Sequence, residues 1–212
     1  MARLNVVFDF GAVLFTWQPH KLVREVFTSS VSNDAQAVAL AKAIFSHPDW
    51  HAFDAGRVSQ LEVTQRTHAR TGLELSELTA MIDSIGQRLV PIASSVDVLR
   101  DLHARRSAGQ DIGLYFLSNM PEPYARVLES THEFLSWFDD GIFSGDVKLI
   151  KPDAAIYELA IQRFGLQGRT VFIDDLEANI DASQAHGWHG VHLPAPHLLP
   201  ELLGKKLGSF TT

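Results

Sequence analysis

The stretch VVFDFGAVLF, residues 6–15, joins a run of apolar side chains to a single carboxylate, Asp9. β-branched and aromatic residues dominate positions 4–10, so this segment is predicted to be a strand buried on both faces of a parallel sheet. Asp9 would then lie near the carboxyl end of the strand, where open parallel sheets bind their ligands. The segment therefore predicts both a fold class and the place of a site.

Two further segments share this apolar character, DIGLYFLSN at 111–119 and RTVFIDD at 169–175. Each ends in polar residues and is followed by a helical pattern. A weaker apolar segment, GVHLP at 190–194, is a candidate for the last strand. Alternation of strands and helices predicts an α/β protein with a Rossmann-like parallel sheet and right-handed crossover connections.

The region between the first two predicted strands has a different sequence pattern. From about residue 18 to residue 89 the patterns are helical, with no strong strand candidate. We therefore expect a Rossmann-like core made of residues 1–16 and 90–212, and an inserted α-helical cap domain made of residues 17–89.

Composition excludes several function classes. The chain has 212 residues, no cysteine and a formal net charge of −7, with its basic residues scattered. A nucleic-acid partner is not expected, because no basic patch is present to neutralise phosphates. Disulfides, thiolate metal sites and thiol nucleophiles are excluded. No uncharged apolar run approaches the roughly 20 residues that span a bilayer, so we expect a soluble, cytoplasmic protein without a membrane partner.

Polar residues end three of the predicted strands, and a fourth polar residue, Lys151, lies immediately before Pro152 at the start of a predicted helix. Taken singly, each is explained as a turn former or a helix cap. Together they supply an aspartate nucleophile, oxygen ligands for Mg²⁺, hydroxyl and amide donors and a fixed ammonium, which are the requirements of phosphoryl transfer through a carboxylate. The groups are Asp9, Ser118 with Asn119, Lys151 and the pair Asp174 and Asp175.

These four groups make the sequence resemble the haloacid dehalogenase-like (HAD) hydrolase superfamily, which consists mostly of phosphatases. VVFDFGAVL, LYFLSN, KLIKPDAAIY and VFIDDLEANIDASQAHG are similar to its four motifs, in order and over nearly the whole chain. The helical insert resembles the cap of the first subclass. The FDFG start and the FIDDLEANIDA segment are most similar to the branch of glucose-1-phosphate phosphatase and the N-terminal phosphatase domain of epoxide hydrolase.

The resemblance implies a role for each motif residue. Asp9 would be the nucleophile that forms an aspartyl phosphate, and Lys151 would neutralise charge on it and on the phosphoryl group. Ser118 and the amide of Asn119 would hold the phosphoryl oxygens. Asp9, the carbonyl of Gly11, Asp174 and Asp175 would hold Mg²⁺, with Asp175 the first choice for direct ligation. The implied function is a Mg²⁺-dependent phosphomonoesterase acting on a small phosphorylated metabolite, with a sugar phosphate favoured.

Position 11 departs from the family pattern, which has there a second aspartate that serves as general acid and base. Gly11 offers a carbonyl oxygen but cannot move a proton. General acid–base help is typically worth about 10²–10⁴ in rate. Either the leaving group scarcely needs protonation, or a cap residue or a water molecule supplies the proton; His20, His47 and His51 are the histidines considered for this role, and ordinary surface positions are expected for them.

Two rival functions remain open from the sequence. Metal-independent 2-haloacid dehalogenases of the superfamily also lack the second aspartate, because halide leaves without a proton. Against this function stand the adjacent Asp174 and Asp175, whose charges favour a bound cation. A non-catalytic binding protein that retains the fold is the second rival, and the intact motif residues argue against it. The sequence does not indicate an oligomeric state.

Overall fold

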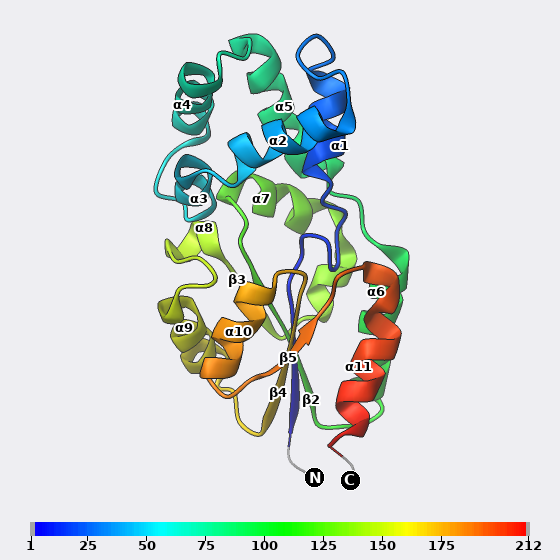
Figure 1. The fold of residues 1–212 in the computed structure, drawn as a ribbon. Helices are drawn as coiled ribbons and strands as arrows, with labels where there is room; N and C mark the ends of the chain where they lie inside the picture. The colour runs from blue at the N-terminus through cyan, green and yellow to red at the C-terminus, as the bar shows by residue number, and fades with distance from the viewer. Residues whose placement is uncertain (1–2, 211–212) are drawn as a thin grey trace.

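A five-stranded parallel sheet forms the centre of the computed structural model, which describes residues 3–210 (Figure 1). Its order is β3-β2-β1-β4-β5, so β1 is central and the chain moves outward from it in both directions. The strands are β1 (Leu4–Phe8), β2 (Ile112–Ser118), β3 (Asp140–Phe143), β4 (Arg169–Asp174) and β5 (His189–His192). The expected α/β class with a Rossmann-like sheet is confirmed.

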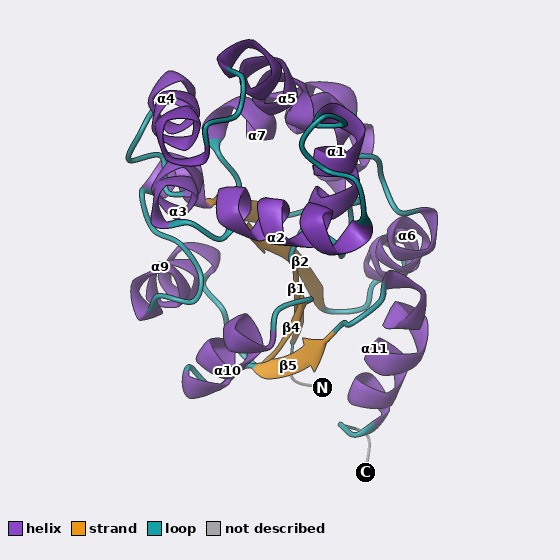
Figure 2. Cartoon of the chain, turned by 45° about the horizontal axis from the view of Figure 1, so that its top comes forward, coloured by secondary structure: helices purple, strands orange, loops and turns teal. Residues whose placement is uncertain are grey.

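Helices cover both faces of the sheet (Figures 1 and 2). One face carries α9 (Ala154–Phe164) and α10 (Glu177–Ala185), and the other carries α6 (Ala93–Ser107) and α11 (Leu199–Gly208). The remaining elements of the core are α7 (Glu122–Thr131), η1 (Glu133–Trp137), α8 (Ser144–Val147) and η2 (Pro196–Leu198). Within residues 3–210, no helix has both the length and the apolar character needed to cross a membrane.

Strand β1 is buried on both faces, which explains its continuous apolar sequence. Because successive side chains of a strand point to opposite faces, Val6 and Phe8 enter the larger hydrophobic cluster while Val7 enters the smaller one. All three side chains are fully buried. The apolar run thus fixes a rigid central strand, and the residue that follows it is held at the edge of this core.

Five helices lie between β1 and α6 and sit above the carboxyl ends of the strands (Figure 1). We call them the cap helices: α1 (Pro19–Val26), α2 (Asp34–Phe45), α3 (Pro48–Asp54), α4 (Gln60–Thr71) and α5 (Leu75–Arg88). Helix α4 begins with a capping box, in which Ser59 and Glu62 satisfy each other's backbone amides. The helices that the sequence predicts for this region are present.

Three local features of the structure are not evident from the sequence patterns. The short strand β3, Asp140–Phe143, has no apolar run of its own and exists through its pairing with β2. Helix α3 begins within the segment HPDWH, residues 47–51. Pro48 occupies its first turn and His47 caps it. Helix α6 begins at Ala93, directly after Ile92, without a side-chain cap.

The cap helices contact the core closely where the loop after α3 meets α8. Gly56 has φ of +62°, and a Cβ added there would lie 2.2 Å from the carbonyl oxygen of Gly145. Arg57 Nη2 donates to the carbonyl of Lys148 at 3.0 Å in the same contact. Only glycine permits this approach of the two backbones.

We expect Gly56→Ala to destabilise the protein more than Gly72→Ala. Both glycines have a left-handed φ, but a Cβ at Gly72 would meet no atom within 4 Å. Each alanine costs about 1–2 kcal/mol in left-handed strain, and the collision at Gly56 adds a further ~1–3 kcal/mol through backbone displacement. Urea unfolding of both variants measures the difference, and equal losses would show that the contact with Gly145 contributes nothing.

Candidate active site

Asp9 is placed by the end of β1 and by a tight turn directly after it. Its backbone N–H donates to the carbonyl of Ile173 on β4 at 2.9 Å. The carbonyl of Phe10 then accepts from the amides of Val13, Leu14 and Phe15 at 2.8–3.2 Å, which turns the chain away from the sheet. Asp9 is 7% exposed. Its carboxylate is therefore fixed at the boundary between β1 and β4, where the strand order diverges.

Lys151 lies between two carboxylates. Its Nζ is 2.8 Å from Oδ1 of Asp9 and 2.6 Å from Oδ2 of Asp174, and its side chain is 1% exposed. Burial alone would lower the pKa of Lys151, but Asp174 and Asp9 together raise it above its ordinary value. The ammonium group is thus charged at every physiological pH and balances one of the two negative charges.

The backbone of Lys151 is held by Asn119. The Asn119 Nδ2 donates to the carbonyl of Lys151 at 2.9 Å, and the Lys151 amide donates to Asn119 Oδ1 at 2.8 Å. The following peptide bond, to Pro152, is cis. The sequence suggests a phosphoryl contact for the amide of Asn119, but it gives no sign of this second role for its side chain, which links the ends of two elements distant in sequence.

Asp174 is the most heavily bonded carboxylate of the group. It is fully buried, and besides Lys151 it accepts hydrogen bonds from the Leu176 amide at 2.8 Å and from Asn179 Nδ2 at 3.0 Å on each oxygen. The carbonyl of Asn179 accepts from the Tyr157 hydroxyl at 3.0 Å. These bonds fix the orientation of Asp174, which in turn holds Lys151 beside Asp9.

Three carboxylates converge at this point. Asp9, Asp174 and Asp175 each offer an oxygen, and these oxygens lie within 4.8 Å of one another. Burial, opposed by Lys151, raises the pKa of Asp9 to about 6. Burial and the negative charges of Asp9 and Asp174 raise the pKa of Asp175 to about 7. Hard oxygen donors with this excess of negative charge fit a divalent cation such as Mg²⁺.

The structure brings the other predicted residues to the same edge of the sheet. Ser118 ends β2 and is 1% exposed, and within residues 3–210 its hydroxyl has no hydrogen-bond partner, which leaves it able to bind a ligand. Gly11 follows in the turn after Asp9. A Cβ on Gly11 would meet only Trp17, at 3.8 Å, so a side chain at this position would be tolerated.

The three histidines considered as proton donors lie in α1 and in or next to α3. His47 is the N-cap of α3, where its Nδ1 accepts a hydrogen bond from the Asp49 amide at 3.1 Å. His51 is exposed on the same helix, and His20 lies in the first turn of α1, partly exposed. His47 is therefore committed to a structural role.

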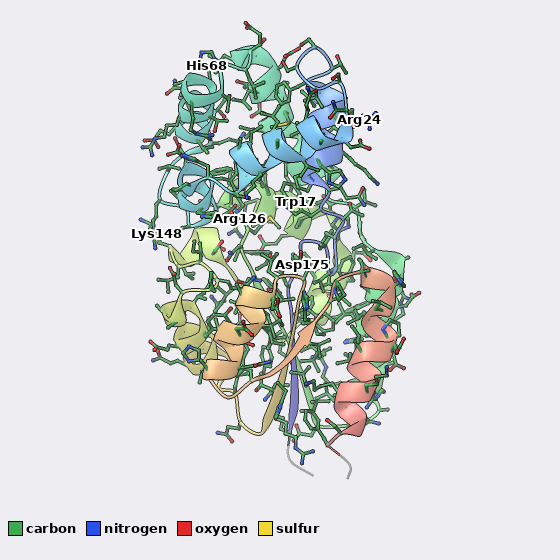
Figure 3. All side chains as sticks on the ribbon, in the orientation of Figure 1. Trp17, Arg24, His68, Arg126, Lys148 and Asp175 are labelled. Atoms are coloured by element: carbon green, nitrogen blue, oxygen red, sulfur yellow. The ribbon has the colours of Figure 1, made fainter. Side chains whose placement is uncertain are left out.

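Aromatic side chains lie between the cap helices and the sheet. Edge-to-face contacts connect Trp17 to Phe45, Phe45 to Trp50, Trp50 to Phe53 and Phe53 to Tyr124, with ring centroids 4.6–5.7 Å apart. In Figure 3, Asp175 lies at the upper end of the sheet, with Trp17 above it toward the cap helices. Trp50, Phe53 and Tyr124 are buried, so this row of rings packs α3 against α7.

Solved structures of other proteins share this fold. A HAD family enzyme from Bacteroides thetaiotaomicron, in complex with magnesium and inorganic phosphate, is 17% identical, with a TM-score of 0.67 over 90% of this chain and 93% of its own. The L-2-haloacid dehalogenase from Xanthobacter autotrophicus is 18% identical, with a TM-score of 0.65 over 91% of this chain and 77% of its own. Identity at this level supports the fold alone.

Sequence comparison extends the likeness beyond the fold. The sesquiterpene phosphatase astK of Aspergillus oryzae is 30% identical over 189 residues, which are 88% of each chain. The family model for haloacid dehalogenase-like hydrolases matches residues 5–187. That range includes every residue of the cluster described above. The chain therefore belongs to the haloacid dehalogenase-like hydrolase family, and it is a hydrolase.

Proposed function

We propose that this protein is a Mg²⁺-dependent phosphomonoesterase that acts on a small organic phosphate through an aspartyl-phosphate intermediate. The observation that carries the proposal is the position of the Lys151 ammonium, which is in contact with both Asp9 and Asp174 at the carboxyl edge of the sheet. A carboxylate nucleophile facing a phosphate dianion needs such a fixed positive charge.

Each residue of the cluster has a defined task in this proposal. An oxygen of Asp9 attacks phosphorus while Lys151 offsets the charge of both groups, and Ser118 donates its hydroxyl to a phosphoryl oxygen. The amide of Asn119 donates to another phosphoryl oxygen. Asp174 does not react, because Lys151, Leu176 and Asn179 already occupy its oxygens.

The carboxylate oxygens fit Mg²⁺, which would be held by Asp9 and Asp175 with the carbonyl of Gly11, and by Asp174 directly or through water. When bound, the cation supplies positive charge for the equatorial oxygens of the transferred phosphoryl group. Burial, together with the charges of Asp9 and Asp174, raises the pKa of Asp175 to about 7, and a bound cation would offset the charges of these carboxylates.

The test is phosphate release from a panel of esters in Mg²⁺ or in EDTA. The panel contains p-nitrophenyl phosphate and sugar phosphates. It also contains farnesyl phosphate, because the relative from Aspergillus oryzae is named a sesquiterpene phosphatase. We expect release in Mg²⁺ and none in EDTA, with the preferred ester showing which substrate class fits beneath the cap helices.

The dehalogenase alternative is measured in parallel as chloride release from 2-chloropropionate. That reaction needs no cation, so its activity would survive EDTA. Chloride release in EDTA together with no phosphate release from any ester would contradict the proposal. Mg²⁺ binding, measured by calorimetry, without turnover of either substrate class would instead favour the binding protein.

A further inference from the structure

Ser144 is a fully buried serine to which the proposed function gives no role. It is the first residue of α8 and directly follows β3, whose register with β2 pairs Phe143 with Ser118. Ser144 and Asn119 therefore both lie one residue beyond this last pair, at the carboxyl edge of the sheet. The side chain of Ser144 is thus placed beside the 118–120 loop, which holds both proposed phosphoryl donors.

Ser144 and Gly145 together bind both polar groups of the Met120 backbone. The Met120 amide donates to Ser144 Oγ at 2.8 Å, and the Gly145 amide donates to the Met120 carbonyl at 3.1 Å. A Cβ added to Gly145 would lie 2.9 Å from that carbonyl oxygen and 2.7 Å from the Glu122 amide nitrogen, so the two backbones are in close contact. The position of Ser144 therefore fixes the end of the 118–120 loop.

The same hydroxyl group is bonded to the cap helices. Ser144 Oγ donates to the carbonyl of Asp54, the last residue of α3, at 2.5 Å. The last carbonyls of a helix have no partner within it. The three carbonyls before that of Asp54 accept from the amides of residues 55–57, whereas that of Asp54 is bonded by the core. Docking of α3, whose end lies above α8 in Figure 1, thus supplies the partner that this carbonyl lacks inside the helix.

Because one hydroxyl group makes both contacts, the two contacts are coupled. A serine hydroxyl has a single proton, and here Asp54 receives it while Oγ accepts from Met120. Within residues 3–210, the other acceptor within reach of the hydroxyl is the Met120 carbonyl at 3.5 Å, which already accepts from Gly145. Withdrawal of α3 would leave the hydroxyl with a poorer acceptor, and it would weaken the bond from Met120, since linked hydrogen bonds strengthen one another.

We propose that Ser144 is a positioning residue that makes phosphoryl binding by the 118–120 loop depend on the docking of α3. The inference rests on the proposed phosphatase function. With α3 docked, Ser144 holds Met120 and so keeps the neighbouring Asn119 amide in place for a phosphoryl oxygen. With α3 displaced, the loop loses this support and binds the phosphoryl group more weakly.

Two variants break this connection from opposite sides, and each has a matched control. Ser144→Ala removes the hydroxyl group; Ser183→Ala removes another fully buried one, whose hydrogen bond lies within α10. Gly56→Ala must displace α3 or α8, because its Cβ would lie 2.2 Å from the Gly145 carbonyl oxygen. Gly72→Ala adds the same left-handed strain to the cap helices, but its Cβ would have no atom within 4 Å.

The experiment measures the binding of inorganic phosphate in Mg²⁺, as competitive inhibition of p-nitrophenyl phosphate hydrolysis, at a temperature where every variant is folded. Ser144→Ala leaves the buried Met120 amide without its partner, so we expect phosphate to bind about 10-fold more weakly, and Gly56→Ala should have a similar effect. Since both changes break one connection, the double variant should also lose about 10-fold, and not the product of about 100-fold. The two controls should bind phosphate as the unaltered protein does.

Hydrogen exchange of the Met120 amide reports the same connection without turnover. Exchange should be faster in Ser144→Ala, which removes the acceptor, and also in Gly56→Ala, which keeps Ser144 but displaces α3. Gly72→Ala should leave it unchanged. Mass spectrometry of peptides that end on either side of Met120 resolves this amide, and Gly56→Ala decides the test if Ser144→Ala does not fold.

The outcomes separate this inference from the proposed function. Turnover of p-nitrophenyl phosphate by the unaltered protein establishes the phosphatase whatever Ser144 does. With that established, unchanged phosphate binding or unchanged Met120 exchange in Gly56→Ala would overturn the dependence on α3, as would losses that multiply in the double variant. No phosphate release by the unaltered protein from any ester would overturn the phosphatase and the role of Ser144 together.

Discussion

Replacing Asp9 with asparagine is expected to lower phosphate-ester hydrolysis by about 10⁴-fold or more, because the variant has no oxygen that can bond to phosphorus. The loss should be equally severe for p-nitrophenyl phosphate and for alkyl phosphates, because both need the same nucleophile. Acid quenching during turnover should trap a phosphoryl group on the peptide that contains Asp9. Phosphate release measures the loss of rate. Mass spectrometry of the quenched unaltered protein and of the variant locates the phosphoryl group.

The same substitution should not damage the fold. Burial raises the pKa of Asp9 to about 6, so the ionised carboxylate lowers stability as the pH rises through that value. Asparagine removes this charge, and Lys151 keeps its pair with Asp174. We therefore expect the melting temperature of Asp9→Asn at pH 8 to equal or exceed that of the unaltered protein.

An exposed aspartate on α6 provides the control for the Asp9 substitution. Asp101→Asn should change neither the rate nor the melting temperature. If Asp9→Asn keeps a substantial rate while its fold is intact, or if the trapped phosphoryl group lies on another peptide, Asp9 is not the nucleophile.

Replacing Lys151 with methionine should have the largest effect on stability. The substitution leaves Asp9 and Asp174 buried together without the cation that they share. Removing one partner of a buried ion pair typically costs about 3–5 kcal/mol. We expect a loss of this order in the free energy of unfolding at neutral pH, measured by urea denaturation in EDTA, with loss of turnover as well.

The pH dependence of this loss follows from the charges. Lys151 lowers the pKa of Asp9, so its removal raises that pKa above the present value of about 6. A raised pKa in the folded state gives stability that is present below the unfolded value of about 4 and is lost as the pH rises through the folded value. Lys151→Met should therefore be least destabilised near pH 5 and most destabilised at pH 8.

Added Mg²⁺ should return part of the stability lost in Lys151→Met at pH 8, because a cation among the carboxylates offsets the same charge. Lys42→Met, a change to an exposed lysine of α2, should show neither the loss nor the pH dependence. A Lys151→Met protein as stable at pH 8 as at pH 5 would contradict the view that Lys151 balances two buried carboxylates.

The sequence alone predicted the sheet class and the residues that gather at its edge. The apolar runs that became β1, β2 and β4 were recognisable because strands buried on both faces cannot carry polar residues except at their ends. The polar ends of these strands then indicated Asp9, Ser118 and the pair Asp174 and Asp175 without any knowledge of tertiary contacts, since parallel strands share one carboxyl edge.

Only the tertiary structure decided the contacts that join distant segments. Strand β3 could not be predicted, because its four residues depend on pairing with β2. The hydrogen bonds of Asn119 to Lys151 cross 32 residues, and the bond from Ser144 to Asp54 crosses 90. Local patterns of hydrophobicity report which face of an element is buried, but they carry no information about which polar group a folded chain will place opposite another. The charged residues of the site could thus be predicted from the sequence, whereas the pairing of Lys151 with Asp9 and Asp174 depends on packing that only the folded chain creates.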